Sequence, residues 1–137
     1  MTSLPRAKLF WRMNVMQEAL IIDDNRTTAD ALSQMLKVLG FKSRVAYGSR
    51  AAMSVLGTGF TPMFVCLDIN MPGLDGTEIL AYLRREPRLI PVPVFIITSD
   101  DQPETRRKVM KLGATVMIIK PATIDALEDA LKKAKLS

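Results

Sequence analysis

Three aspartates in this sequence directly follow apolar runs, and their placement suggests a shared site. Asp23 and Asp24 come after the run ALII, and Asp68 comes after MFVCL. Carboxylates held close together in a partly buried site repel one another unless a cation joins them or their pKa values rise. Mg²⁺ takes oxygen ligands and usually binds through one or two carboxylates together with water and phosphate. The three carboxylates therefore predict a site for Mg²⁺, with Mn²⁺ as an alternative.

A hydroxyl and an ammonium group follow two later apolar runs. Thr98 ends the run VFIIT, and Lys120 follows VMII. A carboxylate beside a bound metal ion can act as a nucleophile toward phosphorus, and Asp68 is the natural candidate. Thr98 would then donate a hydrogen bond to one phosphoryl oxygen, and Lys120 would neutralise the charge of another. Together these residue types predict phosphoryl transfer to a carboxylate.

Each of these residues also has a simpler interpretation. The aspartate pair could be the solvated end of a strand, with Asp24 or Asn25 capping the helix that follows. Asp68 could cap the next turn, and Lys120 could be an ordinary surface lysine. Taken alone, the capping interpretation of the pair is the preferred one, so the metal site depends on the carboxylates meeting in space.

The elements that must position these groups are visible in the apolar pattern. Short apolar runs predict strands, and apolar residues at helical spacing between them predict helices. Five strands alternating with five helices predict a three-layer α/β domain with a five-stranded parallel sheet. In such sheets, ligands bind beyond the carboxyl ends of the strands. The predicted strands are 19–23, 43–46, 63–68, 92–98 and 116–119, and the predicted helices are 26–39, 49–56, 77–85, 103–112 and 123–131.

Composition limits the remaining function classes. The chain has 137 residues, enough for one domain, and no apolar run approaches the ~20 residues of a membrane span. The absence of histidine removes the commonest zinc ligand and the commonest general base. The single cysteine, Cys66, excludes an intrachain disulfide and is expected to be a buried small hydrophobe. We therefore expect a cytoplasmic protein.

The net charge of +5 is unevenly distributed. Residues 1–17 contain Arg6, Lys8 and Arg12 without an acidic group, so residues 18–137 carry 16 basic against 14 acidic side chains. A nucleic-acid interface needs a clustered basic face, and this balance argues against one. We divide the chain into an amino-terminal extension of unknown role, residues 1–17, and a domain formed by residues 18–137. The extension could be a short helix, a tail or the product of an upstream start codon.

Four motifs give the sequence a resemblance to the receiver domains of two-component response regulators, including the single-domain chemotaxis type. They are IIDDN at Asp23 and Asp24, LDINMPGLDG at Asp68, FIITS at Thr98, and KPAT at Lys120, and the resemblance covers about residues 18–136. Each motif alone is weak, but four in this order, separated by 44, 30 and 22 residues, are specific. The resemblance implies the flavodoxin-like strand order 2-1-3-4-5.

The resemblance also implies roles for individual residues. Asp68 would be the phosphoacceptor and a metal ligand, and Asp24 a direct Mg²⁺ ligand. Asp23 would act close by or through water, and the backbone carbonyl of Asn70 would be a further ligand. The bond between Lys120 and Pro121 would be cis, a form nearly confined to X-Pro bonds.

One position departs from the family pattern. Receivers usually carry Tyr or Phe three residues before the lysine, where the ring moves inward on phosphorylation, and here that residue is Met117. Thr98 and Met117 would form the switch. Methionine can fill the same space, but it has neither a ring nor a hydroxyl. The departure leaves phosphate chemistry in place and puts the usual signal coupling in question.

The function implied by the resemblance is phosphorylation-dependent signalling. A sensor histidine kinase or histidine phosphotransferase would supply the phosphoryl group, and a downstream protein would bind, for example through residues 103–136. We expect a monomer or weak dimer, without nucleic-acid binding and without a following output domain. The chain would catalyse only its own phosphorylation and dephosphorylation.

Three alternatives remain. A degenerate receiver would bind partners without being phosphorylated, as Met117 could indicate. A haloacid-dehalogenase-like phosphatase would need a general acid at position 70, where Asn70 stands. A flavin- or nucleotide-binding module would need a phosphate loop where Asp23 and Asp24 lie.

Overall fold

The computed structural model describes residues 18–71 and 75–137, so the extension 1–17 and part of the loop after Asp68 lie outside the described residues. Five strands alternate with five helices along the chain, as predicted. The elements are β1 (Glu18–Ile22), α2 (Arg26–Val38), β2 (Lys42–Ala46), α3 (Ser49–Gly57), β3 (Val65–Leu67), α4 (Gly76–Arg85), β4 (Val94–Thr98), α5 (Pro103–Lys111), β5 (Val116–Ile119) and α6 (Ile124–Lys133).

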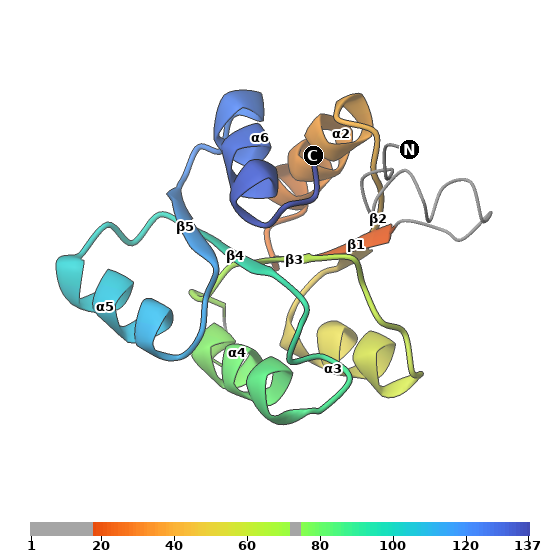
Figure 1. The fold of residues 1–137 in the computed structure, drawn as a ribbon, viewed down its shortest axis with the longest axis vertical. Coiled ribbons are helices and arrows are strands. Elements are labelled where there is room, and N and C mark those ends of the chain that lie inside the picture. Colours follow the sequence, from red (N-terminus) through yellow and green to blue (C-terminus); the bar gives the residue numbers. More distant parts are fainter. Residues whose placement is uncertain (1–17, 72–74) are drawn as a thin grey trace, which may run out of the picture.

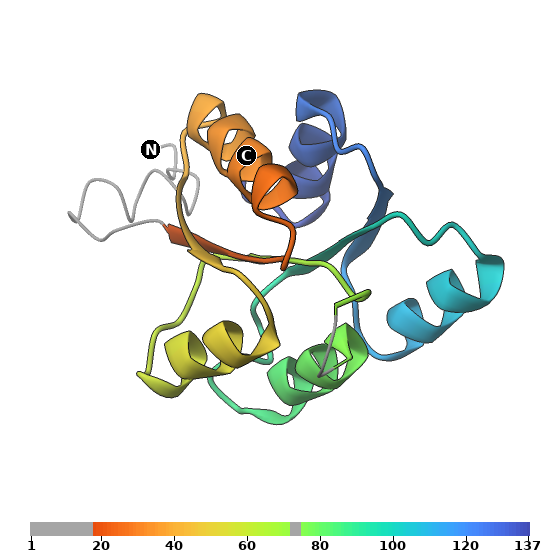
Figure 2. The same cartoon turned by 180° about the vertical axis from the view of Figure 1, so that it is seen from behind.

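All five strands are parallel and lie in the order β2-β1-β3-β4-β5, which confirms the predicted topology. Helices α2 and α6 cover one face of the sheet, and α3, α4 and α5 cover the other (Figure 1). Figure 2 shows the same three layers from behind. β1, β3 and β4 lie inside the sheet between two layers of helices, and this explains why their sequences are apolar without alternation.

Each face of the sheet has its own apolar core. Under α2 and α6, the rings of Phe41, Phe64 and Phe95 contact one another, with centroids 5.2 Å apart in each neighbouring pair. Cys66 is buried in this layer, as expected, and burial raises the pKa of its thiol to about 12. The other core contains Met117, which packs in the layer of α3, α4 and α5.

Several element ends differ from the sequence expectation. β3 is limited to Val65–Leu67, although the amide of Met63 and the carbonyl of Phe64 already bond to β1. β4 begins at Val94 because Pro93 has no N–H to donate to a ladder. Helix α3 includes Gly57, one residue beyond the predicted end at 56, and the chain turns at Gly59, whose φ of 90° suits glycine.

Side-chain caps set the beginning of three helices. Asn25 accepts a hydrogen bond from the amide of Thr28 at 3.0 Å, and in the same way Asp75 caps α4 and Thr123 caps α6. The cap of α2 is therefore Asn25 and not Asp24. This leaves the carboxylate of Asp24 free for another role.

No helix within the two described ranges combines the length and apolar character that crossing a bilayer would require.

Candidate functional site

Three carboxylates meet beyond the carboxyl ends of β1 and β3. Asp23 is 1% exposed and Asp68 is 6% exposed, whereas Asp24 is open to solvent. One carboxylate oxygen from each residue lies within 4.8 Å of the others. β1 and β3 are neighbours in the sheet, with Ile22 opposite Leu67, so both strands end at the same level. The sequence predicted this cluster from the strand ends alone.

Lys120 lies between the two buried carboxylates. Its Nζ is 3.0 Å from Oδ2 of Asp23 and 3.1 Å from Oδ2 of Asp68. Burial lowers the pKa of Lys120, but the bond to Asp23 and the charge of Asp68 outweigh it, so the pKa is raised overall. The side chain therefore remains an ammonium ion and offsets part of the repulsion in the cluster.

Asp68 is held in a fixed orientation. Its amide donates to the carbonyl of Ile22 at 3.0 Å, and its Oδ1 accepts a hydrogen bond from the amide of Asn70 at 3.1 Å. Burial raises the pKa of Asp68, although the Asn70 amide and Lys120 act in the opposite direction. A carboxylate whose charge costs free energy in the folded state gains from a nearby cation.

Thr98 is fully buried at the end of β4. Its Oγ1 accepts hydrogen bonds from Nδ2 of Asn70 at 3.3 Å and from the amide of Asp100 at 3.2 Å. The structure thus connects Thr98 to Asp68 through Asn70, which bonds to both residues. The carbonyl of Asn70 as a metal ligand stays a prediction.

Two further predictions concern Pro121 and Met117. The Lys120–Pro121 peptide bond is cis, as expected. Met117 is 7% exposed and belongs to the apolar core below the site, and its role in a switch stays a prediction.

The donor set fits a hard divalent cation. Three carboxylates supply oxygen ligands only, and within the described parts of the chain no side chain donates a hydrogen bond to Asp24. A single ammonium facing two of the three acids leaves negative charge to be neutralised. Mg²⁺ and Mn²⁺ suit such a site better than softer metals do.

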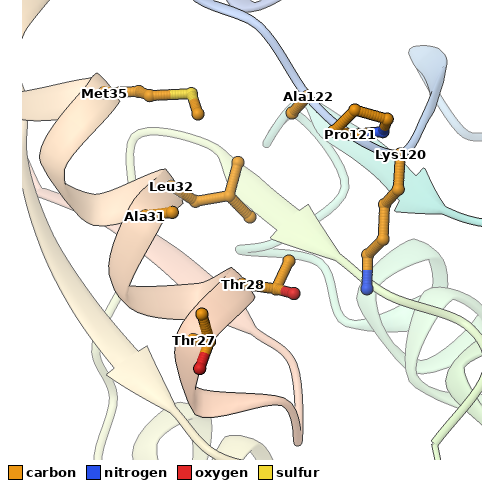
Figure 3. A pocket seen from close by; sticks show the side chains of 8 residues that line it. All are labelled: Thr27, Thr28, Ala31, Leu32, Met35, Lys120, Pro121 and Ala122. Carbon is orange, nitrogen blue, oxygen red and sulfur yellow. The ribbon is translucent and has the colours of Figure 1, made fainter.

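A pocket of about 380 Å³ lies next to the carboxylate cluster. Thr27, Thr28 and Leu32 of α2 line one side, and Lys120 and Pro121 line the opposite side (Figure 3). Lys120 thus faces both the cluster and this pocket.

Gly76 is a residue of the site that the sequence pattern did not reveal. It is buried at the start of α4, and a Cβ at this position would overlap Cα of Ile69 and lie 2.6 Å from the carbonyl oxygen of Asp68. The loop motif contained the glycine, but only the packing of α4 against the backbone after β3 shows why a side chain cannot fit.

Gly76→Ala is expected to destabilise the fold by about 1–3 kcal/mol, because backbone atoms cannot move aside as a flexible side chain would. It should also slow reactions at Asp68. Urea unfolding measures the first effect. The matched control is Gly57→Ala in α3, where an added Cβ meets no described atom within 4 Å and stability should stay equal or rise by up to about 1 kcal/mol. Equal stabilities of the two variants would contradict the packing argument.

Comparisons with known proteins identify the family of the chain. The family model of the response regulator receiver domain matches residues 19–132. The chain is 31% identical over 122 residues to chemotaxis protein CheY-3 of Vibrio cholerae, covering 88% of this chain and 93% of the relative. It is 27% identical over 123 residues to a probable methanogenesis regulatory protein, FilR2, of Methanothrix harundinacea, covering 85% and 79%.

Solved structures give the same result. The signal receiver domain of a DNA-binding response regulator from Colwellia psychrerythraea superposes with a TM-score of 0.78 at 30% identity, covering 85% of this chain and 95% of that one. A putative response regulator from Chloroflexus aurantiacus has a TM-score of 0.80 at 23% identity, covering 89% and 99%, and shows the fold alone. The chain belongs to the response regulator receiver domain family.

Proposed function

We propose that the protein accepts a phosphoryl group on Asp68 and signals through a change in its protein contacts. The observation that carries the proposal is the arrangement around Asp68: two further carboxylates within 4.8 Å and the ammonium of Lys120 at 3.1 Å. A sensor histidine kinase or a histidine phosphotransferase would be the donor. Residues 18–137 would form the receiver unit.

In the proposed reaction, a carboxylate oxygen of Asp68 attacks the phosphorus of a phosphohistidine. A new P–O bond forms, the P–N bond breaks, and the imidazole leaves with the electron pair. Lys120 already donates to Asp68 and lies where it can donate to a phosphoryl oxygen, and the hydroxyl of Thr98 supplies a second donor. Hydrolysis of the aspartyl phosphate by water resets the site, so the chain acts only on itself.

Asp23, Asp24, Asp68 and the carbonyl of Asn70 would hold the Mg²⁺ ion. When bound, Mg²⁺ neutralises charge on the phosphoryl oxygens, which favours a transition state in which that charge is spread over three atoms.

A downstream partner would bind through residues 103–136. Support comes from the surface of α5, where Arg106, Arg107 and Lys111 are exposed together with Met110, which is 43% exposed. Ile124, at the start of α6, is 40% exposed. We propose a protein partner and no nucleic acid, and a monomer or weak dimer for the chain itself.

Incubation with acetyl phosphate and Mg²⁺ tests the proposal. Intact-mass spectrometry should show the addition of one phosphoryl group to the wild type, and none to Asp68→Asn or to the wild type with a chelator. Asp101→Asn, which removes an exposed acid from the β4–α5 loop, should behave as the wild type. An unmodified wild type would favour the alternative, a receiver that binds its partners without phosphorylation.

A further inference from the structure

A chain of hydrogen bonds runs from Thr98 at the site to the first turn of α5. The amide of Asp100 donates to Oγ1 of Thr98 at 3.2 Å, and Oδ2 of Asp100 accepts a hydrogen bond from the hydroxyl of Thr105 at 2.7 Å. Oδ1 of Asp100 accepts from the amide of Gln102 at 3.0 Å. Asp100 is therefore held by α5 on one side and holds Thr98 on the other.

The bonds to Thr98 determine what its hydroxyl can do. A threonine hydroxyl has one proton to donate and two lone pairs that accept. Asn70 and the amide of Asp100 both donate to Oγ1, so both lone pairs are used. The proton of Thr98 is then left for donation, and the two donors fix the directions that remain open to it. Moving the Asp100 amide would move this proton.

Asp100 replaces the missing cap of α5. Gln102, the N-cap residue of α5, makes no side-chain capping bond, and the carboxylate of Asp100 binds the amide of Gln102 and the hydroxyl of Thr105 instead. These bonds, that from Gln102 first, lower the pKa of Asp100 and keep it ionised. Of the nine residues of α5, only Val109 is buried. Because α5 has so few core contacts, its position depends more strongly on the hydrogen bonds at its first turn than that of a well-buried helix would.

We infer that Thr105 is a positioning residue for Thr98, acting through Asp100, and that this chain of bonds couples α5 to the phosphoryl site. The inference rests on the proposed function, in which Thr98 donates to the phosphoryl group. These hydrogen bonds connect the site to the surface of α5. In this receiver the residue at the usual switch position, Met117, has neither a ring nor a hydroxyl. Because coupling free energies are reciprocal, a partner that binds α5 more tightly after phosphorylation also shifts the phosphorylation equilibrium of Asp68 toward the phosphorylated form.

The test compares Thr105→Val, Thr105→Ser and the wild type. With acetyl phosphate at saturating Mg²⁺, Thr105→Val should be phosphorylated about 10-fold more slowly because the donor to the phosphoryl group is displaced. Its Mg²⁺ affinity should be unchanged, and Thr105→Ser, which keeps the hydroxyl, should restore the rate. Thr58→Val removes a hydroxyl that donates to the carbonyl of Val55 at the carboxyl end of α3, outside the chain of bonds to Thr98, and should leave the rate unchanged.

Hydrogen exchange provides a readout that a merely structural role would not move. In the wild type, phosphorylation should change the protection of the Thr105 and Arg106 amides, and in Thr105→Val this response should be lost. In an Asp100→Ala background, Thr105→Val should have no additional effect on rate or protection. Wild-type rates and an unchanged exchange response in Thr105→Val would overturn the inference while the proposed function stands. A wild type that takes no phosphoryl group would overturn both.

Discussion

An Asp24→Ala variant is expected to lose Mg²⁺ binding and phosphorylation while it keeps the fold of the wild type. Asp24 is the exposed member of the carboxylate cluster, and its oxygen lies within 4.8 Å of those of Asp23 and Asp68. Loss of a direct carboxylate ligand should weaken Mg²⁺ binding by more than roughly 100-fold, since loss of an outer-shell partner alone costs up to that factor. Phosphorylation by acetyl phosphate should fall in proportion.

The fold of Asp24→Ala should not suffer, because Asn25 and not Asp24 caps α2. Removing one of three mutually repelling charges should leave the free energy of unfolding without metal within about 0.5 kcal/mol of the wild type, or raise it. Calorimetric Mg²⁺ titration and urea unfolding measure the two effects separately. Asp101→Ala, an exposed acid outside the cluster, is the control. If Asp24→Ala is phosphorylated at the wild-type rate, the metal-site hypothesis is wrong and the aspartate pair is only the solvated end of a strand.

A Lys120→Met variant should have the opposite effect on stability. Methionine keeps most of the aliphatic volume but removes the ammonium that lies 3.0 Å from Asp23 and 3.1 Å from Asp68. Two carboxylates with side chains only 1% and 7% exposed would then face each other without that cation. Breaking a buried ion pair in this way should cost about 2–4 kcal/mol of stability.

Mg²⁺ should restore part of the stability of Lys120→Met, because the added cation relieves the same repulsion. Even with Mg²⁺, Lys120→Met should be phosphorylated roughly 100-fold or more slowly than the wild type, since a donor to the developing negative charge is missing. Urea unfolding with and without Mg²⁺, together with phosphorylation rates, tests both expectations. Lys132→Met, at an exposed lysine that lies 3.9 Å from Glu128, should change neither quantity. A Lys120→Met protein as stable as the wild type without metal would contradict the ion-pair argument.

The fold could be predicted from the sequence because four of the five strands are apolar runs and a helical period follows each strand. The exception is β2, KSRVA, whose apolar pattern is weak. The ends were less predictable. MFVCLD reads as one strand, yet regular pairing is limited to Val65–Leu67, since an apolar pattern reports burial and not ladder geometry. Pro93 shortens β4 because its nitrogen carries no hydrogen to donate to the neighbouring strand. The proline is visible in the sequence, but the pattern of apolar residues does not show its effect.

For the candidate site, the sequence identified which side chains reach the same rim but not how they pair. Nothing in the spacing shows that Lys120 contacts Asp23 as well as Asp68. Gly76 appeared only as part of a turn, and its contact with the backbone of Asp68 and Ile69 depends on the placement of α4. These contacts could not be predicted from the sequence, because they join residues that are far apart in the chain and follow no helix or strand periodicity.

The pairing of Asp23 with Lys120 joins residues that are 97 positions apart. We expect contacts between such distant residues to form late in folding, because the entropy lost in closing a long loop must be offset before they contribute. A chain that has paired β1 with β3 but has not yet added β5 holds Asp23 and Asp68 close together without Lys120. Docking of β5 should then be favoured by charge as well as by apolar burial, because it brings Lys120 to the two buried carboxylates. Under the proposed function, the step that completes the sheet would also bring Lys120 to the phosphoacceptor Asp68.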